Sequence, residues 1–154
     1  MKKYFFSITV ALIIGFFLSS AFLKQYNDYN GIKVNNIGEN LYFIQYGVFS
    51  TLESMEENTI SLENYIYNID DNKYFVYIGI TKNLSNKNKI INYFESLGYK
   101  VIVKEYGITN KEFLNLLDNY DSTLKSTDDK TAISSIINQV LIKYEEVVIN
   151  GNQN

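Results

Sequence analysis

A near-repeat in the middle of the chain constrains the fold more than any other feature. The residues from Tyr42 to Phe49 (YFIQYGVF) match those from Tyr74 to Thr81 (YFVYIGIT) at a constant offset of 32 residues, with Tyr, Phe and Gly at the same places. Both copies are rich in aromatic and β-branched residues, which favour strands. A repeat on this scale predicts two structural halves that each begin with a strand.

The first half has signals for a helix and a second strand after its opening strand. Ser50 and Glu53 have the spacing of a capping box, which predicts that a helix begins there. The segment Tyr65–Ile69 (YIYNI) then has the composition of a strand. Residues 70–73 (DDNK) supply a turn into the second half, because Asp and Asn tolerate turn conformations.

The second half repeats this order. Asn83 or Ser85 can cap a helix, and Gly98 stands where a glycine ends one. A closing strand is predicted at Val101–Val103 with its flanking residues. Each half therefore reads strand, helix, strand.

The predicted order βαββαβ over residues 41–108 indicates an α+β, ferredoxin-like or RNP-like domain, in which a four-stranded antiparallel sheet carries two helices on one face. The other face of the sheet is then open. Because side chains alternate along a strand, assigning the more aliphatic sets to the helix side leaves a second set on the open face. This second set is Phe43, Gln45, Phe75 and Tyr77. We expect an exposed aromatic binding surface; the alternative is that C-terminal helices cover it.

The N-terminal domain, residues 1–23, is predicted to be a membrane anchor. Residues 4–23 (YFFSITVALIIGFFLSSAFL) contain no charge and, as a helix, would span about 30 Å of bilayer. Two lysines precede this run, so the positive-inside rule predicts a single-pass protein in the cell membrane, with a cytoplasmic N-terminus and an extracytoplasmic C-terminal domain. The alternative is a signal peptide cleaved after Ala21. Residues 24–40 are polar and rich in Asn and Gly, which predicts a linker.

The composition speaks against catalysis. The 154 residues include no Cys and no His, so the chain has no thiolate nucleophile, no imidazole base and no conventional zinc site. Adjacent carboxylates such as Glu56 and Glu57 diverge on a helix and cannot act together as a glycosidase pair. We therefore expect a non-enzymatic protein that needs no cofactor and no metal.

The charge balance argues against nucleic acid as a partner. Residues 24–154 carry 12 Lys against 17 Asp and Glu, and the chain has no Arg to clamp phosphate or guanine. An RNA-recognition-motif domain is the alternative with the same topology, since it also displays aromatic residues on its first and third strands. The acidic charge, the lack of Arg and the predicted extracytoplasmic location disfavour it.

Two segments resemble the sequence signatures of the SPOR family. The stretch QYGVF at residues 45–49 is similar to the Q-x-G-x-F opening of SPOR domains, and residues 74–79 (YFVYIG) are similar to their second glycine signature. SPOR domains have the same two-halved order and are usually displayed outside a single N-terminal membrane helix. The resemblance covers residues 41–108.

This resemblance implies binding to peptidoglycan, in particular to glycan strands stripped of their stem peptides, at the division or sporulation septum. In the family the open sheet face carries the glycan and the Gln of the first strand, here Gln45, contributes to it. Around Gln45 the predicted glycan-binding residues are Phe43, Phe75 and Tyr77, whose rings can stack on sugars. The family often has Arg at the position of Phe75 and Pro at that of Ile80.

Residues 109–154 are predicted to be a helical extension. Thr109 and Glu112 form a capping box before a short helix, and a longer helix at about 130–148 carries a continuous apolar stripe. This stripe either packs within the protein or docks another membrane or division protein. Docking defines the alternative function, an envelope protein-protein interaction module that has lost glycan binding, with other division or sporulation proteins as its partners.

Overall fold

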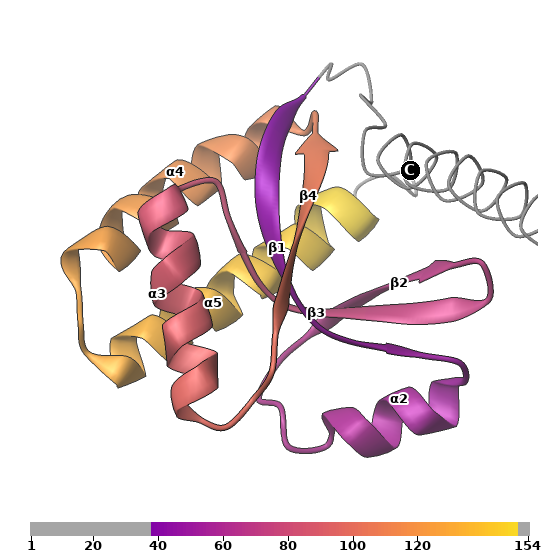
Figure 1. Ribbon diagram of the computed structural model, residues 1–154. Helices are drawn as coiled ribbons and strands as arrows, with labels where there is room; N and C mark the ends of the chain where they lie inside the picture. Colours follow the sequence, from indigo (N-terminus) through magenta and orange to yellow (C-terminus); the bar gives the residue numbers. More distant parts are fainter. Residues whose placement is uncertain (1–37, 151–154) are drawn as a thin grey trace, which may run out of the picture. The chain divides into compact units, whose positions relative to one another are not determined.

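Four antiparallel strands form the centre of the computed structural model, which describes residues 38–150 (Figure 1). The strands are β1 (Glu39–Phe49), β2 (Ile66–Asp70), β3 (Lys73–Thr81) and β4 (Ile102–Ile108). Their order across the sheet is β2-β3-β1-β4, and every pair is antiparallel. The two copies of the repeat are β1 and β3, the two central strands. The predicted α+β class with its four-stranded antiparallel sheet is confirmed.

The helices follow the predicted order βαββαβ and then extend it. The helical elements are α2 (Leu52–Thr59), α3 (Leu84–Ser96), α4 (Lys111–Ser126), α5 (Lys130–Tyr144) and the short π-helix η1 (Glu145–Ile149). The helix α4 continues to Ser126, beyond the short helix predicted, because its turn around Asp121 packs into the protein instead of forming a solvated connection. Together, α5 and η1 cover the predicted helix at 130–148.

Two helices are capped by the residue that follows the predicted cap. The backbone of Thr51 is extended (φ −138°, ψ 155°), and its hydroxyl, not that of Ser50, accepts a hydrogen bond from the Ser54 N–H at 3.1 Å. Likewise Asn110, not Thr109, caps α4 by accepting from the Phe113 N–H at 3.0 Å. A side-chain oxygen next to the first helical residue reaches these N–H groups directly, so it displaces the neighbouring candidate.

The turn and cap signals of the two halves are otherwise confirmed. Asp71 and Asn72 have φ of 46° and 55°, the left-handed pair of a tight hairpin turn between β2 and β3. Gly98 follows α3 with φ 88°. Asn83, one of the two predicted caps, accepts hydrogen bonds from the backbone at the start of α3.

Helices cover both faces of the sheet, which overturns the prediction of an open face. A Cβ atom at Gly79 would lie 3.0 Å from the side chain of Ile90 on α3 and 3.3 Å from that of Ile44, so this face belongs to α3. The preceding residue of β1, Phe43, points to the opposite face. There its ring meets the ring of Tyr144 on α5, with 5.4 Å between ring centroids.

The apolar stripe of α5 is part of the core. Its members are buried in the same cluster as the central strands and α4: Ile133, Ile136, Ile137, Val140 and Leu141 from α5, with Phe113, Leu114, Leu117 and Leu124 from α4. The prediction that the stripe packs within the protein is confirmed. Because the domain itself occupies this surface, the stripe is not free to dock another protein.

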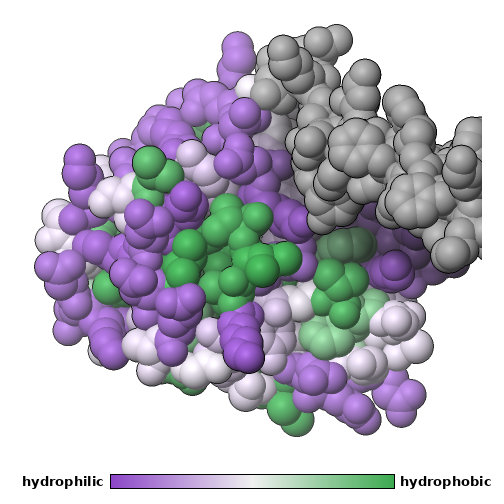
Figure 2. Space-filling model, in the orientation of Figure 1, coloured by the Kyte–Doolittle hydropathy of each residue, from purple (hydrophilic) through white to green (hydrophobic). Residues whose placement is uncertain are grey.

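The core reaches the surface on one face. Figure 2 shows apolar side chains gathered between α3 and β4 on the face in view, with hydrophilic residues around them. Partly buried Ile91 of α3 and Val103 of β4 pack against the core.

The predicted anchor at residues 1–23 lies outside the described residues, as does the predicted linker up to residue 37. The last residues assigned to the linker belong to the sheet instead, since β1 begins at Glu39. Within residues 38–150, no helix is both long and apolar enough to cross a bilayer.

Candidate functional site: an aromatic pocket under the C-terminal helix

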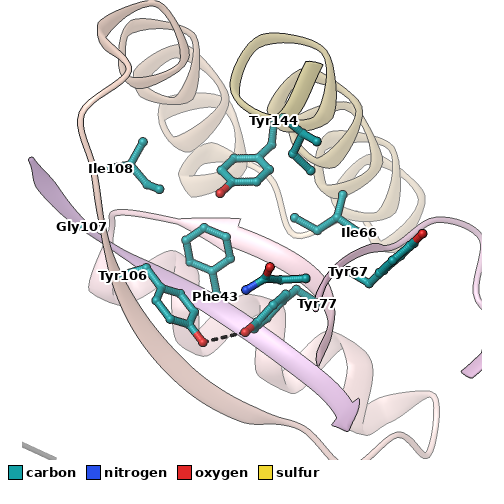
Figure 3. A pocket seen from close by; sticks show the side chains of 10 residues that line it. Phe43, Ile66, Tyr67, Tyr77, Tyr106, Gly107, Ile108 and Tyr144 are labelled. Atoms are coloured by element: carbon teal, nitrogen blue, oxygen red, sulfur yellow. Dashed lines mark hydrogen bonds between the residues drawn. The ribbon is translucent and has the colours of Figure 1, made fainter. Parts of the chain in front are cut away.

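A pocket of about 370 Å³ opens between the sheet and the C-terminal end of α5 (Figure 3). We call it the aromatic pocket. Rings and aliphatic side chains dominate its wall, with one amide among them: Phe43, Ile66, Tyr67, Asn68, Tyr77, Tyr106, Gly107, Ile108, Tyr144 and Ile149. None of the residues that line it in the described chain is charged. It is a largely apolar site with a few polar groups, as small-ligand sites commonly are.

Three rings from three different strands form a rigid cluster in this pocket. Phe43 of β1 lies edge-on to Tyr77 of β3 and to Tyr106 of β4, with 5.5 Å and 5.1 Å between ring centroids. Tyr77 and Tyr106 meet at 5.8 Å, also nearly perpendicular. Tyr144 closes the cluster from α5, held in turn by the ring of Phe113 at 5.1 Å. Edge-to-face pairs favour these orientations, so the rings are pre-positioned.

The polar groups of the pocket are two phenols and an amide. The hydroxyl oxygens of Tyr77 and Tyr106 are 2.6 Å apart and share a hydrogen bond. Burial and, secondarily, this hydrogen bond raise the pKa of Tyr77, while burial raises the pKa of Tyr144. Asn68 shares a face of β2 with the buried Ile66 and is itself exposed. Within residues 38–150 the Asn68 side chain makes no hydrogen bond, so its amide is available.

The predicted site residues separate into two groups. Phe43 and Tyr77 line the pocket and touch each other, whereas Gln45 and Phe75 do not line it. Their predicted exposure is wrong for three of the four: Phe43, Gln45 and Tyr77 are only 2%, 3% and 4% exposed, and Phe75 is half-buried. The physical reason is the packing of α5 onto this face through Tyr144.

Gln45 differs most from its expected role. It is buried between β3 and β4, opposite Tyr77 and Ile102, and its Oε1 has no hydrogen-bond partner among the described residues. Because Gln45 does not line the aromatic pocket, a ligand bound there would not contact its side chain.

Eight of the ten residues that line the pocket were not predicted as site residues, and three of them, Tyr106, Tyr144 and Asn68, supply rings of the cluster or the amide. Tyr106 lies on β4, which was predicted only around Val101–Val103 but extends to Ile108, and the strand-favouring Tyr106 and Ile108 were the available signal. Tyr144 was read only as a member of the helical stripe. Asn68 had no distinguishing signal, because an Asn in a short strand is as common at an edge as at a site.

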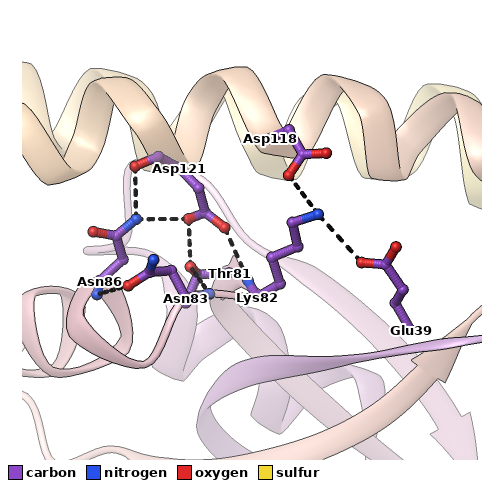
Figure 4. Close-up of polar contacts among 7 residues, drawn as sticks. All are labelled: Glu39, Thr81, Lys82, Asn83, Asn86, Asp118 and Asp121. Atoms are coloured by element: carbon purple, nitrogen blue, oxygen red, sulfur yellow. Dashed lines mark hydrogen bonds and ion pairs between the residues drawn. The ribbon is translucent and has the colours of Figure 1, made fainter.

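A second hollow is polar and has a structural explanation (Figure 4). The buried carboxylate of Asp121 on α4 accepts hydrogen bonds from the Thr81 hydroxyl, from the Lys82 N–H at 3.0 Å and from the Asn86 amide at 2.8 Å. The Lys82 ammonium forms ion pairs with Asp118 and Glu39. The hydrogen bond to Asp118 is the main reason that the pKa of Lys82 is raised. These hydrogen bonds and ion pairs join α4 to the junction of β3 and α3, and of the cluster's buried side-chain atoms only Asn86 Oδ1 has no partner among the described residues.

Comparison of the chain with protein-family models, with curated proteins and with solved structures found no match in any of the three.

The raised pKa of Tyr77 predicts a loss of stability in alkali. The folded state holds the phenol proton more tightly than the unfolded state, whose pKa is about 10. The resulting stabilisation is complete below about pH 10 and is lost as the pH rises above it. Replacing Tyr77 by Phe removes this titration. The free energy of unfolding of Tyr77→Phe, measured with urea, should therefore decline more slowly above about pH 10, by up to about 1.4 kcal/mol per pH unit.

Tyr67→Phe is the matched control, because the exposed Tyr67 lies at the rim of the same pocket. Its unfolding free energy should follow that of the wild type. Parallel declines for Tyr77→Phe and the wild type would show that burial of Tyr77 has no linkage to folding.

Proposed function

We propose that this chain is a non-catalytic, membrane-anchored protein that binds peptidoglycan, specifically glycan strands without stem peptides, at the division or sporulation septum. The aromatic pocket is the observation that carries the proposal. Sugar rings offer C–H faces that pack on aromatic rings and hydroxyls that pair with amides and phenols, and the pocket supplies both kinds of partner. The similarity of residues 41–108 to SPOR domains, with their ferredoxin-like order and two helices on one face, directs the proposal to peptidoglycan.

The proposed site differs from that of the resembled family in its position. SPOR domains carry glycan on an open sheet face, whereas α5 covers the corresponding face here. In the proposal Phe43 and Tyr77, which are almost fully buried, form only the inner wall of the pocket. The exposed rings of Tyr67 on β2 and Tyr106 on β4 replace Gln45 and Phe75 as the surfaces on which a sugar can pack. In this proposal, stacking on aromatic rings and hydrogen bonds to an amide replace the polar contacts that the family's Arg makes with the glycan.

Electrostatics favours a glycan without stem peptides. Natural stem peptides carry free carboxylates, and residues 24–154 have an excess of acidic residues. The uncharged pocket offers no cation to compensate such groups. A stripped strand retains only the lactyl carboxylates of its muramic acid units, so this repulsion, which is screened only beyond about 8 Å at physiological salt, is weaker. The same repulsion disfavours nucleic acid.

Co-sedimentation with cell-wall sacculi tests the proposal. The full chain in detergent micelles should pellet with sacculi whose stem peptides were removed by an amidase, and much less with untreated sacculi. Tyr106→Ala should weaken this binding about tenfold, since loss of a stacked ring in a site costs 1 kcal/mol or more. Tyr93→Ala, on α3 and outside the pocket, is the matched control.

A wild-type chain that stays in the supernatant, under conditions in which an established SPOR domain pellets, would overturn the proposal. Circular dichroism of each variant separates loss of binding from loss of folding.

A further inference from the structure

The aromatic pocket is too small and too uniformly neutral to treat both sugars of the peptidoglycan repeat alike. Its volume of about 370 Å³ lies near the lower limit of ligand pockets, which run from about 300 to 1,000 Å³, so it holds one ring system and not a strand. The two sugars of the repeat are N-acetylglucosamine, which is neutral, and N-acetylmuramic acid, which carries a lactyl group. In a stripped strand that lactyl group ends in a free carboxylate.

Burying a carboxylate in this pocket would be unfavourable. Phe43, Tyr77 and Tyr144 are packed edge to face with little solvent access, and none of the pocket-lining residues described is a cation. Moving an ion from water into a site that offers no oppositely charged partner costs several kcal/mol of desolvation free energy. The neutral sugar has no such penalty, because its acetamido group needs only hydrogen bonds.

Asn68 supplies those hydrogen bonds. Its side-chain amide lines the pocket and has no partner in the described part of the chain. An amide presents both a donor and an acceptor, the same pair that an acetamido group presents in reverse. The apolar side chains of Ile66 and Ile108 line the same pocket and suit the acetamido methyl group.

A groove next to the aromatic pocket offers a path for the part of the glycan that extends beyond the bound sugar. This groove shares Ile66, Tyr67, Asn68 and Ile149 with the aromatic pocket and continues across the outer strand β2 to Ile69. Glu145 also lines it. A lactyl carboxylate on the next sugar would have to point away from Glu145, so both hollows disfavour the acidic unit at the bound end.

We propose that the aromatic pocket selects the neutral N-acetylglucosamine unit of a glycan, with Asn68 reading its acetamido group, and rejects the N-acetylmuramic acid unit. This inference rests on the proposed function and adds which sugar the site takes. Replacing Asn68 should change the choice of sugar without destabilising the protein, because its side chain is exposed and makes no hydrogen bond within the described residues.

Short soluble sugars test this selectivity without sacculi. Isothermal titration calorimetry of the full chain in detergent micelles would compare the trimer of N-acetylglucosamine with cellotriose, an uncharged trimer that has hydroxyl groups in place of the acetamido groups. The acetylated trimer should bind about fivefold more tightly, the factor expected for one hydrogen bond to the amide. The monosaccharide N-acetylglucosamine should likewise compete for the site better than N-acetylmuramic acid.

Variants then assign the selectivity to one side chain. Asn68→Ala should lose about fivefold in affinity for the acetylated trimer and almost none for the other trimer, so that the preference nearly disappears. Asn88→Ala, which changes another asparagine on the distant α3 surface, should behave as the wild type.

The outcomes distinguish this inference from the proposed function. Sacculus binding without binding of the acetylated trimer, or equal binding of the two trimers, would overturn the selectivity and leave peptidoglycan binding intact. Trimer binding that depends on Asn68, without any sacculus binding, would uphold the sugar site and overturn peptidoglycan as its target.

Discussion

A chain truncated after Ile108 is expected to lose cooperative folding. The truncation removes α4 and α5, which supply about half of the buried apolar side chains and cover one face of the sheet. Each such side chain contributes about 1.5–3 kcal/mol when buried, and the net stability of a domain is only about 5–15 kcal/mol. We therefore expect that residues 41–108 do not fold cooperatively without the C-terminal helices.

Urea unfolding followed by circular dichroism measures this effect. The full chain in detergent should show a sigmoidal transition, while the chain ending at Ile108 should show a broad, shallow change. A sigmoidal transition of the truncated chain with a free energy close to that of the full chain would contradict the prediction. It would mean that residues 41–108 bury enough surface by themselves.

A point substitution tests the same packing without removing a segment. Leu117 on α4 is fully buried, whereas Leu84 at the start of α3 is 58% exposed. Leu117→Ala should cost about 2–5 kcal/mol of unfolding free energy, because it leaves a cavity in the core. Leu84→Ala, the same change at an exposed position, should stay within about 0.5 kcal/mol of the wild type.

The secondary structure could be predicted because it depends on local signals. The strands β1 and β3 have the aromatic and β-branched residues that suit a sheet, and Asp71-Asn72 has the residues that a left-handed turn requires. These preferences act between near neighbours in the chain. The same local nature explains the errors in helix caps, where two adjacent residues were equally good candidates.

The covered sheet face could not be predicted from such signals. An aromatic residue in a strand has the same sequence pattern whether solvent or a helix lies over it. The stripe of α5 showed that this helix buries one side, but no local feature identified the surface beneath it. Only the three-dimensional packing brings Tyr144 onto Phe43, about a hundred residues away in the chain.

The covering helix changes what the aromatic residues can do. On an open face, Phe43 and Tyr77 would present a flat platform to a long strand. Beneath Tyr144 and beside η1 they become the inner wall of a pocket with limited volume. A platform tolerates many sugars, whereas a pocket discriminates among them. For the proposed glycan site, we therefore expect the C-terminal extension to give selectivity together with a smaller contact area than an open face would offer.

Among the polar side chains described, we expect substitution of the buried Asp121 to lower the free energy of unfolding most. Asp121 is 7% exposed and accepts from a hydroxyl, a backbone N–H and an amide, on Thr81, Lys82 and Asn86. In Asp121→Ala the Thr81 hydroxyl and the Lys82 N–H lose this acceptor, while the Asn86 amide keeps its 2.8 Å hydrogen bond to the Asp121 backbone carbonyl. Each buried group left unsatisfied costs about 1–3 kcal/mol. We expect a loss of about 3 kcal/mol or more in the free energy of unfolding, measured with urea near pH 7.

Asp118→Ala is the matched control one turn earlier on the same helix. Asp118 pairs with the Lys82 ammonium, but its side chain is 55% exposed, and surface ion pairs contribute about 0–1 kcal/mol. The two aspartates should therefore differ by about 2 kcal/mol or more. Equal effects of the two substitutions would contradict the assignment of Asp121 as the group that fastens α4 to the junction of β3 and α3, since burial would then make no difference to a carboxylate at this site.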